Sequence, residues 1–270
     1  MTLTNPHELE ELFAVAEAVA DAAREVTMRH FRSPRLLTEN KAAGHFDPVT
    51  IADRDAEAAM RSVLSERRPD DGVLGEEHEN TTGTSGLTWV LDPIDGTRGY
   101  ISGTPTWGTL VSIRDADGPI LGLIDQPYTG ERFIGGPGRA ELLKDGQGTP
   151  LSVAPAAGLD TAILFSTFPE VGTPAEYAAF RAVSSKARLT RYGMDCYAYA
   201  LLAAGQIDLV IEAGLKAYDV QAPMAVIQAA GGIVTDWKGN SPADGGRVLA
   251  AASPVLHQAA LEILSTAPEN

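Results

Sequence analysis

The chain has almost no cysteine and no long hydrophobic run. Cys196 is the only cysteine among 270 residues, so no intrachain disulfide can form, and a reducing compartment fits best. No stretch approaches the roughly 18 unbroken apolar residues that a membrane-spanning helix needs. No basic segment followed by an apolar run marks the N-terminus as a signal peptide. We therefore expect a cytoplasmic protein without membrane contacts.

Basic residues are scarce relative to acidic ones. The chain has 21 Lys and Arg against 36 Asp and Glu, which gives a formal net charge of −15. No basic stripe is present to neutralise a phosphate backbone, which excludes nucleic acid as a partner. Over most of the surface this charge serves solubility. It would repel a small anionic substrate unless bound divalent cations reversed the field locally.

What the chain does have is enough apolar material for a large core. Hydrophobic residues make up 44% of the chain, which has neither an internal repeat nor a long linker. We expect a single domain over residues 1–270, with two closely packed lobes at approximately 1–150 and 151–270.

Sequence periodicity predicts alternating helices and strands. Apolar residues recur at helical spacing over 9–26, and a second helix is expected over about 52–68. The polar stretch 38–48 between them is expected to be a mobile loop. Short apolar segments over 89–134, separated by glycine turns, predict an antiparallel meander. In the last third we expect strands at 163–166, 207–212 and 232–235, and helices at 175–185, 195–204 and 220–230. The pattern predicts layers of mixed α and β structure and leaves the strand order open.

The most informative segment lies at the end of the first strand of this meander. The strand delivers Asp92, a proline forces a turn, and Asp95 follows three residues later. Gly96 and Thr97 then present unpaired backbone N–H groups. Two carboxylates suit hard cations, and adjacent N–H donors suit phosphate oxygens. The same residue types also make ordinary turns, so this segment alone does not identify a site.

Three further acidic residues occupy comparable positions. Glu76 follows a short apolar strand, Asp219 opens a helix after the strand at 207–212, and Asp53 opens the second helix. Each has a plainer interpretation, because Asp53 and Asp219 could serve only as helix caps and Glu76 only as a solvated acid.

Taken together, these motifs resemble those of the inositol-monophosphatase superfamily. The matching segments are Glu76-Glu77, Asp92-Pro93-Ile94-Asp95-Gly96-Thr97, Tyr218-Asp219 and, upstream, Asp47-Pro48-Val49-Thr50-Ile51-Ala52-Asp53, with Lys41 at the place of a basic residue. The resemblance extends from the first helix to about Ala252. It implies a metal-dependent, often lithium-sensitive phosphatase with an α+β layered sandwich (α-β-α-β-α), acting as a homodimer on a small phosphate monoester.

The resemblance also implies a role for each residue of these motifs. Glu76, Asp92 and the carbonyl of Ile94 would bind a first Mg²⁺, and Asp92 would bridge to a second that Asp95 and Asp219 complete. A third, weaker Mg²⁺ is implied near Glu76. Such a carboxylate cluster suits magnesium, and two ions can hold both the attacking and the leaving oxygen of an in-line displacement.

The water-activating residues follow from the same resemblance. Thr97 and Asp53 match the pair that orients and deprotonates the nucleophilic water, and the N–H groups of Gly96 and Thr97 would bind a phosphate oxygen. The five histidines show no metal-binding spacing. Cys196 lies near a helix start, where a thiol can be reactive, but we interpret it as a small core residue.

Two departures from the inositol enzymes point to a particular substrate. Arg98-Gly99-Tyr100 follows the aspartate motif where inositol enzymes usually have Asn and Phe, and Asp195 stands where they have a small residue. Both resemble the histidinol-phosphatase branch, which serves histidine biosynthesis. Histidinol phosphate carries a primary ammonium, which Asp195 and Glu212 would bind by charge-assisted hydrogen bonds. Alternatively, Asp195 only caps its helix.

Two other functions stay open. One is an inositol-1-phosphate phosphatase or a broad sugar-phosphate phosphatase. The other is a phosphate- and metal-binding regulatory module without turnover, which would not need the pair Thr97 and Asp53. We therefore predict an enzyme, a metal-dependent phosphoric monoester hydrolase.

Overall fold

The computed structural model describes residues 6–33, 38–40 and 48–268. Lys41, Asp47 and the middle of the predicted loop lie outside the described residues. The two ends of that loop form a short antiparallel pair, β1 (Thr38–Asn40) and β2 (Pro48–Thr50).

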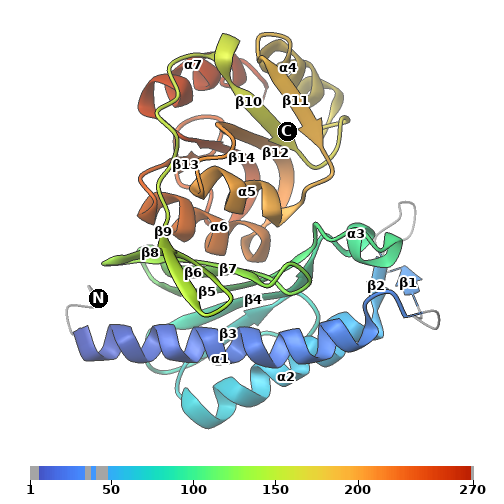
Figure 1. The fold of residues 1–270 in the computed structure, drawn as a ribbon, viewed down its shortest axis with the longest axis vertical. Helices are drawn as coiled ribbons and strands as arrows, with labels where there is room; N and C mark the ends of the chain where they lie inside the picture. Colours follow the sequence, from blue (N-terminus) through green and yellow to red (C-terminus); the bar gives the residue numbers. More distant parts are fainter. Residues whose placement is uncertain (1–5, 34–37, 41–47, 269–270) are drawn as a thin grey trace.

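The chain folds into five layers in the order α-β-α-β-α, as predicted (Figure 1). The first layer holds α1 (Pro6–His30) and α2 (Ile51–Arg67), both close to their predicted bounds. The middle layer holds α5 (Cys196–Ala203) and α6 (Ala217–Ala229), which lie between the two sheets. The last layer holds α4 (Pro174–Ser184) and α7 (Pro254–Leu264). A short helix, α3 (Thr97–Ser102), lies at the edge of the first sheet.

The first sheet has seven strands in sequence order, β3 to β9. They are β3 (Gly72–Gly75), β4 (Thr88–Asp95), β5 (Gly108–Asp115), β6 (Gly118–Gln126), β7 (Glu131–Gly136), β8 (Arg139–Lys144) and β9 (Gln147–Pro150). β3 pairs with β4 in parallel, and every later neighbour pairs antiparallel. Consecutive strands that are joined by tight turns can pair only antiparallel. The observed pairing confirms the predicted meander.

The second sheet has the mixed order β11-β10-β12-β14-β13. Its strands are β10 (Ile163–Ser166), β11 (Leu189–Tyr192), β12 (Leu209–Lys216), β13 (Ile233–Thr235) and β14 (Gly245–Ala251), and the 3₁₀ helix η1 (Leu159–Thr161) precedes β10. β11, β14 and α7 were not predicted from the sequence. The predicted end of β12 at residue 212 is too early, because a bulge between Glu212 and Leu215 lets the strand continue until α6 begins.

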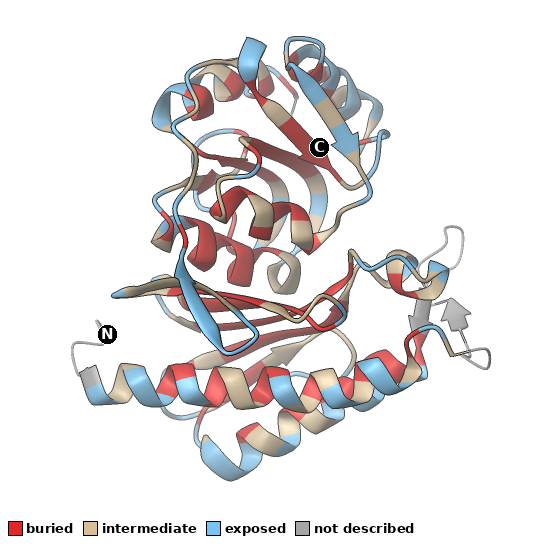
Figure 2. Ribbon diagram, in the orientation of Figure 1, coloured by how far each residue is buried: buried red, intermediate tan, exposed pale blue. Residues whose placement is uncertain are grey.

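One apolar core joins the two sheets through α6. Leu110 and Phe133 of the first sheet belong to the same buried cluster as Val226 of α6 and Val248 of the second sheet. Figure 2 shows α6 buried along most of its length, whereas α1 is exposed on its outer face. A helix between two sheets must be apolar on both faces, and α6 is. None of the described helices is long and apolar enough to cross a membrane.

Candidate active site

Strand β4 delivers two carboxylates to one end of the first sheet. Its pairing with β5 shifts between Asp92 and Asp95, so that one extra residue bulges out. Pro93 lies within this bulge, where the lack of an N–H costs no ladder bond. The Ile94 N–H donates to Asp92 Oδ1 at 3.0 Å, which fixes the direction of the buried Asp92 side chain. Gly96 then adopts a left-handed φ of 85° and begins α3.

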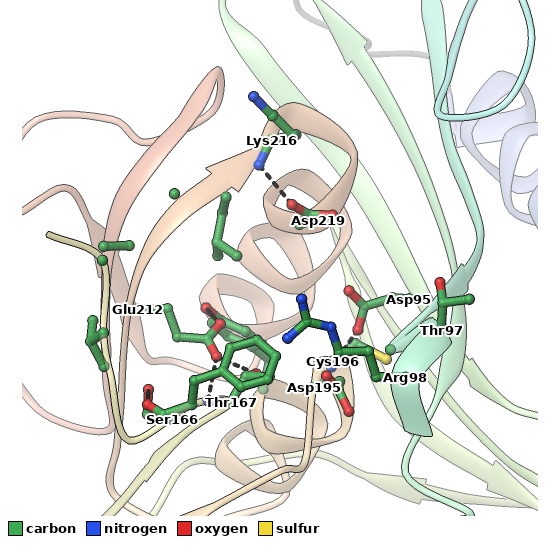
Figure 3. Close-up of a pocket in the computed structure, with 18 of the residues that line it drawn as sticks. Asp95, Thr97, Arg98, Ser166, Thr167, Asp195, Cys196, Glu212, Lys216 and Asp219 are labelled. Carbon is green, nitrogen blue, oxygen red and sulfur yellow. Dashed lines mark hydrogen bonds between the residues drawn. The ribbon is translucent and has the colours of Figure 1, made fainter. Parts of the chain in front are cut away.

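Helix α6 brings a third carboxylate to the same place. Carboxylate oxygens of Asp92, Asp95 and Asp219 all lie within 4.8 Å of one another. The Oδ2 atom of Asp219 accepts the backbone N–H of Lys216 at 2.6 Å and caps α6 (Figure 3). None of the described Lys or Arg side chains forms an ion pair with these three residues. Three converging carboxylates that no described Lys or Arg side chain neutralises fit a hard cation.

The mutual repulsion of these groups appears in their pKa values. Burial, followed by the charges of Glu76 and Asp95, raises the pKa of Asp92 well above its usual range. Burial and the charges of Asp195 and Asp219 do the same for Asp95. Burial also raises the pKa of Asp219 to about 7, with Glu76 and Glu212 adding to the shift. Since a divalent cation would remove this repulsion, the residues present fit a metal site.

Glu76 is held beside this cluster by a residue that sequence reasoning missed. Glu57 of α2 is fully buried, and its Oε2 accepts the N–H of Glu77 at 2.7 Å. The opposite oxygen pairs with Arg61 at 2.7 Å. Gly75 leaves the space for Glu57, because a Cβ there would collide with its carboxylate. The i, i+4 spacing of Glu57 and Arg61 was visible in the sequence, but not its contact with the loop that carries Glu76.

Asp53 serves α2 with one oxygen and faces the β4 loop with the other. Its Oδ2 accepts from the N–H and the hydroxyl of Thr50, at 2.8 and 2.6 Å, and closes a capping box. Its Oδ1 lies 3.5 Å from Thr97 Oγ1. The Thr97 hydroxyl is closer to the Ile94 carbonyl, at 3.2 Å. The capping interpretation of Asp53 is therefore correct, and it leaves one carboxylate oxygen directed at Thr97.

The carboxylate cluster opens into a cavity of about 390 Å³ between the two sheets (Figure 3). The first sheet contributes the loop from Asp95 to Arg98. The second contributes residues around β10, α5 and β12, among them Asp195 and Glu212. The structure thus brings together predicted residues from both lobes, because Asp195 and Glu212 of the second lobe line the same cavity as Asp95 and Asp219 of the cluster.

Asp195 reaches this cavity in an unusual backbone conformation. It has φ 46° and ψ −139°, and its side chain makes no capping hydrogen bond to α5. The first N–H of α5, that of Cys196, instead donates to Asp95 Oδ2 at 2.6 Å. A Cβ on Gly96 would lie 2.8 Å from Asp195 Cγ, so the carboxyl group packs directly against the β4 loop. Burial and the charge of Glu212 raise the pKa of Asp195 to about 7.

Glu212 is buried deeper in the wall and is held by three donors. Its Oε1 accepts from the N–H and the hydroxyl of Thr167, at 2.8 and 2.5 Å, and its Oε2 accepts from the Tyr199 hydroxyl at 2.7 Å. A carboxylate has about four lone-pair positions, so Glu212 retains little capacity for a ligand. Tyr199 is the aromatic residue of α5 that lines the cavity. Thr167 was not singled out from the sequence, and Tyr199 was expected only to pack, with Tyr197 as the tyrosine that could line a pocket.

Cys196 lies at the N-terminus of α5 but has no reactive thiolate. Its side chain is 2% exposed, and burial together with the charge of Asp95 raises the pKa of the thiol well above its usual value. A neutral buried thiol is a weak nucleophile. The interpretation of Cys196 as a small core residue agrees with this geometry.

Comparison with known proteins settles the family. The chain matches the inositol monophosphatase family over residues 8–269. It belongs to that family. It is 41% identical over 268 residues to the bifunctional phosphatase IMPL2, chloroplastic, of Arabidopsis thaliana, covering 95% of this chain and 76% of that protein. Among solved structures it resembles an inositol monophosphatase from Zymomonas mobilis, with a TM-score of 0.82, 34% identity, and coverage of 97% and 99% of the two chains.

Two other relatives of this inositol monophosphatase family member carry different names. A histidinol-phosphatase of Mycobacterium tuberculosis is 33% identical, with 93% of this chain and 96% of that protein covered. An inositol-1-monophosphatase of Caulobacter vibrioides is 32% identical, with coverage of 93% and 99%. Family membership and the acidic cluster make this chain a metal-dependent phosphatase that hydrolyses phosphate monoesters. Overall identity does not distinguish the two substrates.

Proposed function

We propose that this phosphatase hydrolyses L-histidinol phosphate to L-histidinol and phosphate with Mg²⁺ as its cofactor. The observation that carries the proposal is Asp195, an acid in the cavity wall whose carboxyl group packs against the β4 loop beside the carboxylate cluster. A phosphate monoester with its phosphate at the cluster would place its organic part against this wall. An ammonium there would find a carboxylate acceptor, whereas inositol offers only hydroxyl groups.

In this proposal the metal ions are held by residues of both lobes. The proposed ligands are Glu76, Asp92, the carbonyl of Ile94, Asp95 and Asp219. When bound, the ions supply the positive charge that neutralises the phosphate and stabilises the displacement. Magnesium suits this set because every donor is oxygen and the cavity leaves room for water.

The remaining steps belong to Thr97, Asp53 and the β4 loop. Thr97 accepts a hydrogen bond from the attacking water and directs its own proton toward Asp53 Oδ1, 3.5 Å away in the free protein. The N–H groups of Gly96 and Thr97 hold a phosphate oxygen as negative charge spreads over it. Thr50, which occupies the other oxygen of Asp53, keeps that carboxylate in place.

Asp195 is the main acceptor for the substrate ammonium. Glu212 is nearly saturated by Thr167 and Tyr199, so its contribution is chiefly its negative charge. Asp195 makes no capping bond and stands in a conformation that costs a non-glycine residue roughly 1–3 kcal/mol. Such a cost is typical of residues placed for function.

The second candidate is an inositol-1-phosphate or broad sugar-phosphate phosphatase. The similar identities of the two bacterial relatives favour keeping it as the alternative. A panel of histidinol phosphate, inositol-1-phosphate and glycerol phosphate, measured with magnesium and with chelator, separates the two. We expect phosphate release only with magnesium and the highest kcat/KM for histidinol phosphate. A higher value for inositol-1-phosphate would refute the substrate assignment.

We further propose that residues 1–270 act as one domain, in a cytoplasmic homodimer. The shared core of the two lobes supports a single domain, and the homodimer is supported by the family resemblance alone. A single cooperative unfolding transition and a mass of twice 28.5 kDa in solution are the expected results.

A further inference from the structure

Arg98 and Phe168 meet across the mouth of the cavity. Arg98 belongs to α3 and directly follows Thr97, whereas Phe168 lies in the second lobe after β10. The Arg98 Cζ atom lies 4.7 Å from the centroid of the Phe168 ring, and both residues line the cavity with Asp195. Figure 3 shows the Arg98 side chain extending from the α3 side toward the second lobe.

The Phe168 ring is exposed enough for a ligand to stack on it. It is 43% exposed, although a large aromatic side chain gains most when it is buried. The Ser166 hydroxyl donates to the Phe168 carbonyl at 3.4 Å and fixes the turn that presents the ring. An aromatic face next to an acidic cavity favours a cationic occupant, and in the free protein that occupant is the Arg98 guanidinium.

The same guanidinium acts on Asp195. Its charge lowers the pKa of Asp195, against the larger rise caused by burial and Glu212. Asp195 lies near the segment that carries Arg98, since a Cβ on the neighbouring Gly99 would lie 3.5 Å from Asp195 Oδ2. The Arg98 guanidinium therefore lies over the Phe168 ring while its positive charge acts on the Asp195 carboxylate.

We infer that Phe168 and Asp195 form a subsite for a planar cation, and that Arg98 fills this subsite until a ligand displaces it. Guanidinium and imidazolium share a planar N–C–N unit that stacks on an aromatic ring and donates N–H bonds to a carboxylate. The ring would use one oxygen of Asp195 and leave the other to the substrate ammonium. The inference rests on the proposed function, because imidazole is the ring of the proposed substrate. Arg98 is then an internal competitor that weakens binding of the substrate ring.

Methylguanidinium tests the subsite without using the proposed substrate. We would measure its inhibition of glycerol phosphate hydrolysis in the wild type, in Arg98→Ala and in Arg98→Ala/Phe168→Leu. With Arg98 removed, the inhibition constant should fall about ten-fold, and the added Phe168→Leu change should raise it again. Equal inhibition of the wild type and Arg98→Ala would refute the inference, as would full inhibition of the double variant.

Substrate kinetics supply the second readout. In Arg98→Ala, KM for histidinol phosphate should fall relative to KM for glycerol phosphate. A matched control is Tyr177→Leu, which removes a similarly exposed ring, 42% exposed, outside the cavity and should leave the KM ratio as in the wild type. If Arg98→Ala raised KM for both esters equally, Arg98 would bind phosphate and the subsite inference would be wrong.

The two proposals fail in different ways. If the wild type preferred inositol-1-phosphate while methylguanidinium inhibited the variants as expected, the substrate assignment would fail and the subsite would stand. If histidinol phosphate were preferred but methylguanidinium inhibited all variants equally, the subsite would fail and the substrate assignment would stand.

Discussion

The two sides of the cavity are built in different ways. On one side, Asp92 and Asp95 come from a strand bulge and Asp219 comes from a helix N-terminus. Hydrogen bonds from backbone N–H groups two or three residues away fix the orientations of Asp92 and Asp219. On the other side, Asp195 stands in a strained conformation and is packed against a loop of the opposite lobe. In the proposed function, the chemistry shared by the family is carried by local motifs, whereas the proposed choice of substrate depends on contacts between distant segments.

Asp95 connects the two sides. One of its oxygens belongs to the carboxylate cluster, and its Oδ2 accepts the first N–H of α5, the helix that follows Asp195. Because this bond replaces a local cap, the Asp195 side chain is released from capping. The same hydrogen bond joins the β4 loop of the first lobe to the start of α5 in the second.

The largest expected effect comes from the cluster side. Asp92→Asn should lower turnover of every phosphate ester by several orders of magnitude, because it removes a charge that the proposed metal ions share. Chelator should do the same to the wild type, and magnesium should restore activity. Asp244→Asn is a suitable control, since that side chain is 89% exposed at the surface. Near-normal turnover of Asp92→Asn would contradict the account.

A smaller loss is expected for the pair that handles the proton. Thr97→Ala and Asp53→Asn should each lower kcat about 10²- to 10⁴-fold with less change in KM. The double variant should be little worse than either single variant, because the two groups act as one unit. Multiplicative losses in the double variant would leave Asp53 with its capping role only. Thr50→Ser, which retains the hydroxyl that holds Asp53, serves as the control.

The carboxylate cluster should make the effect of magnesium on stability depend on pH. The pKa of Asp219 is raised to about 7 from 3.8. Without metal, its contribution to stability is therefore complete below pH 3.8 and is lost as the pH rises to about 7. Magnesium binds the deprotonated carboxylates, so the rise in Tm on adding magnesium should be larger at about pH 8 than at about pH 5.5. An equal rise at both pH values would contradict this linkage.

The smallest effect concerns the strain on the substrate side. Asp195→Gly should stabilise the protein by about 1 kcal/mol, because relief of the positive φ outweighs the added entropy of the unfolded chain. Asp195→Asn keeps a side chain at the positive φ, and so keeps the strain, but removes the negative charge. Thermal unfolding of the two variants side by side measures the difference. A lower Tm for Asp195→Gly than for Asp195→Asn would show that the conformation is not strained.

The sequence predicted the local features of the site and missed the nonlocal ones. A strand that carries Asp92, a helix starting near Asp219 and the meander between them follow from short patterns. The strand was expected to end in a turn at Pro93, but it continues through a bulge to Asp95. β11, β14 and α7 were missed, and β12 was cut short because its last residues pair with β14, far along the chain. Capping stayed open as the alternative role of Asp195, since the competing bond from Cys196 to Asp95 joins segments 101 residues apart.

The most direct test of the account is the ratio of kcat/KM for histidinol phosphate to kcat/KM for glycerol phosphate, in the wild type and in Asp195→Asn. Loss of a charge-assisted bond costs roughly 1.5–3 kcal/mol, so the ratio should fall by about one to two decades. Because glycerol phosphate shares the cluster but lacks the ammonium, a defect of folding or of the metal site would depress both constants and leave the ratio intact. An unchanged ratio would contradict the account.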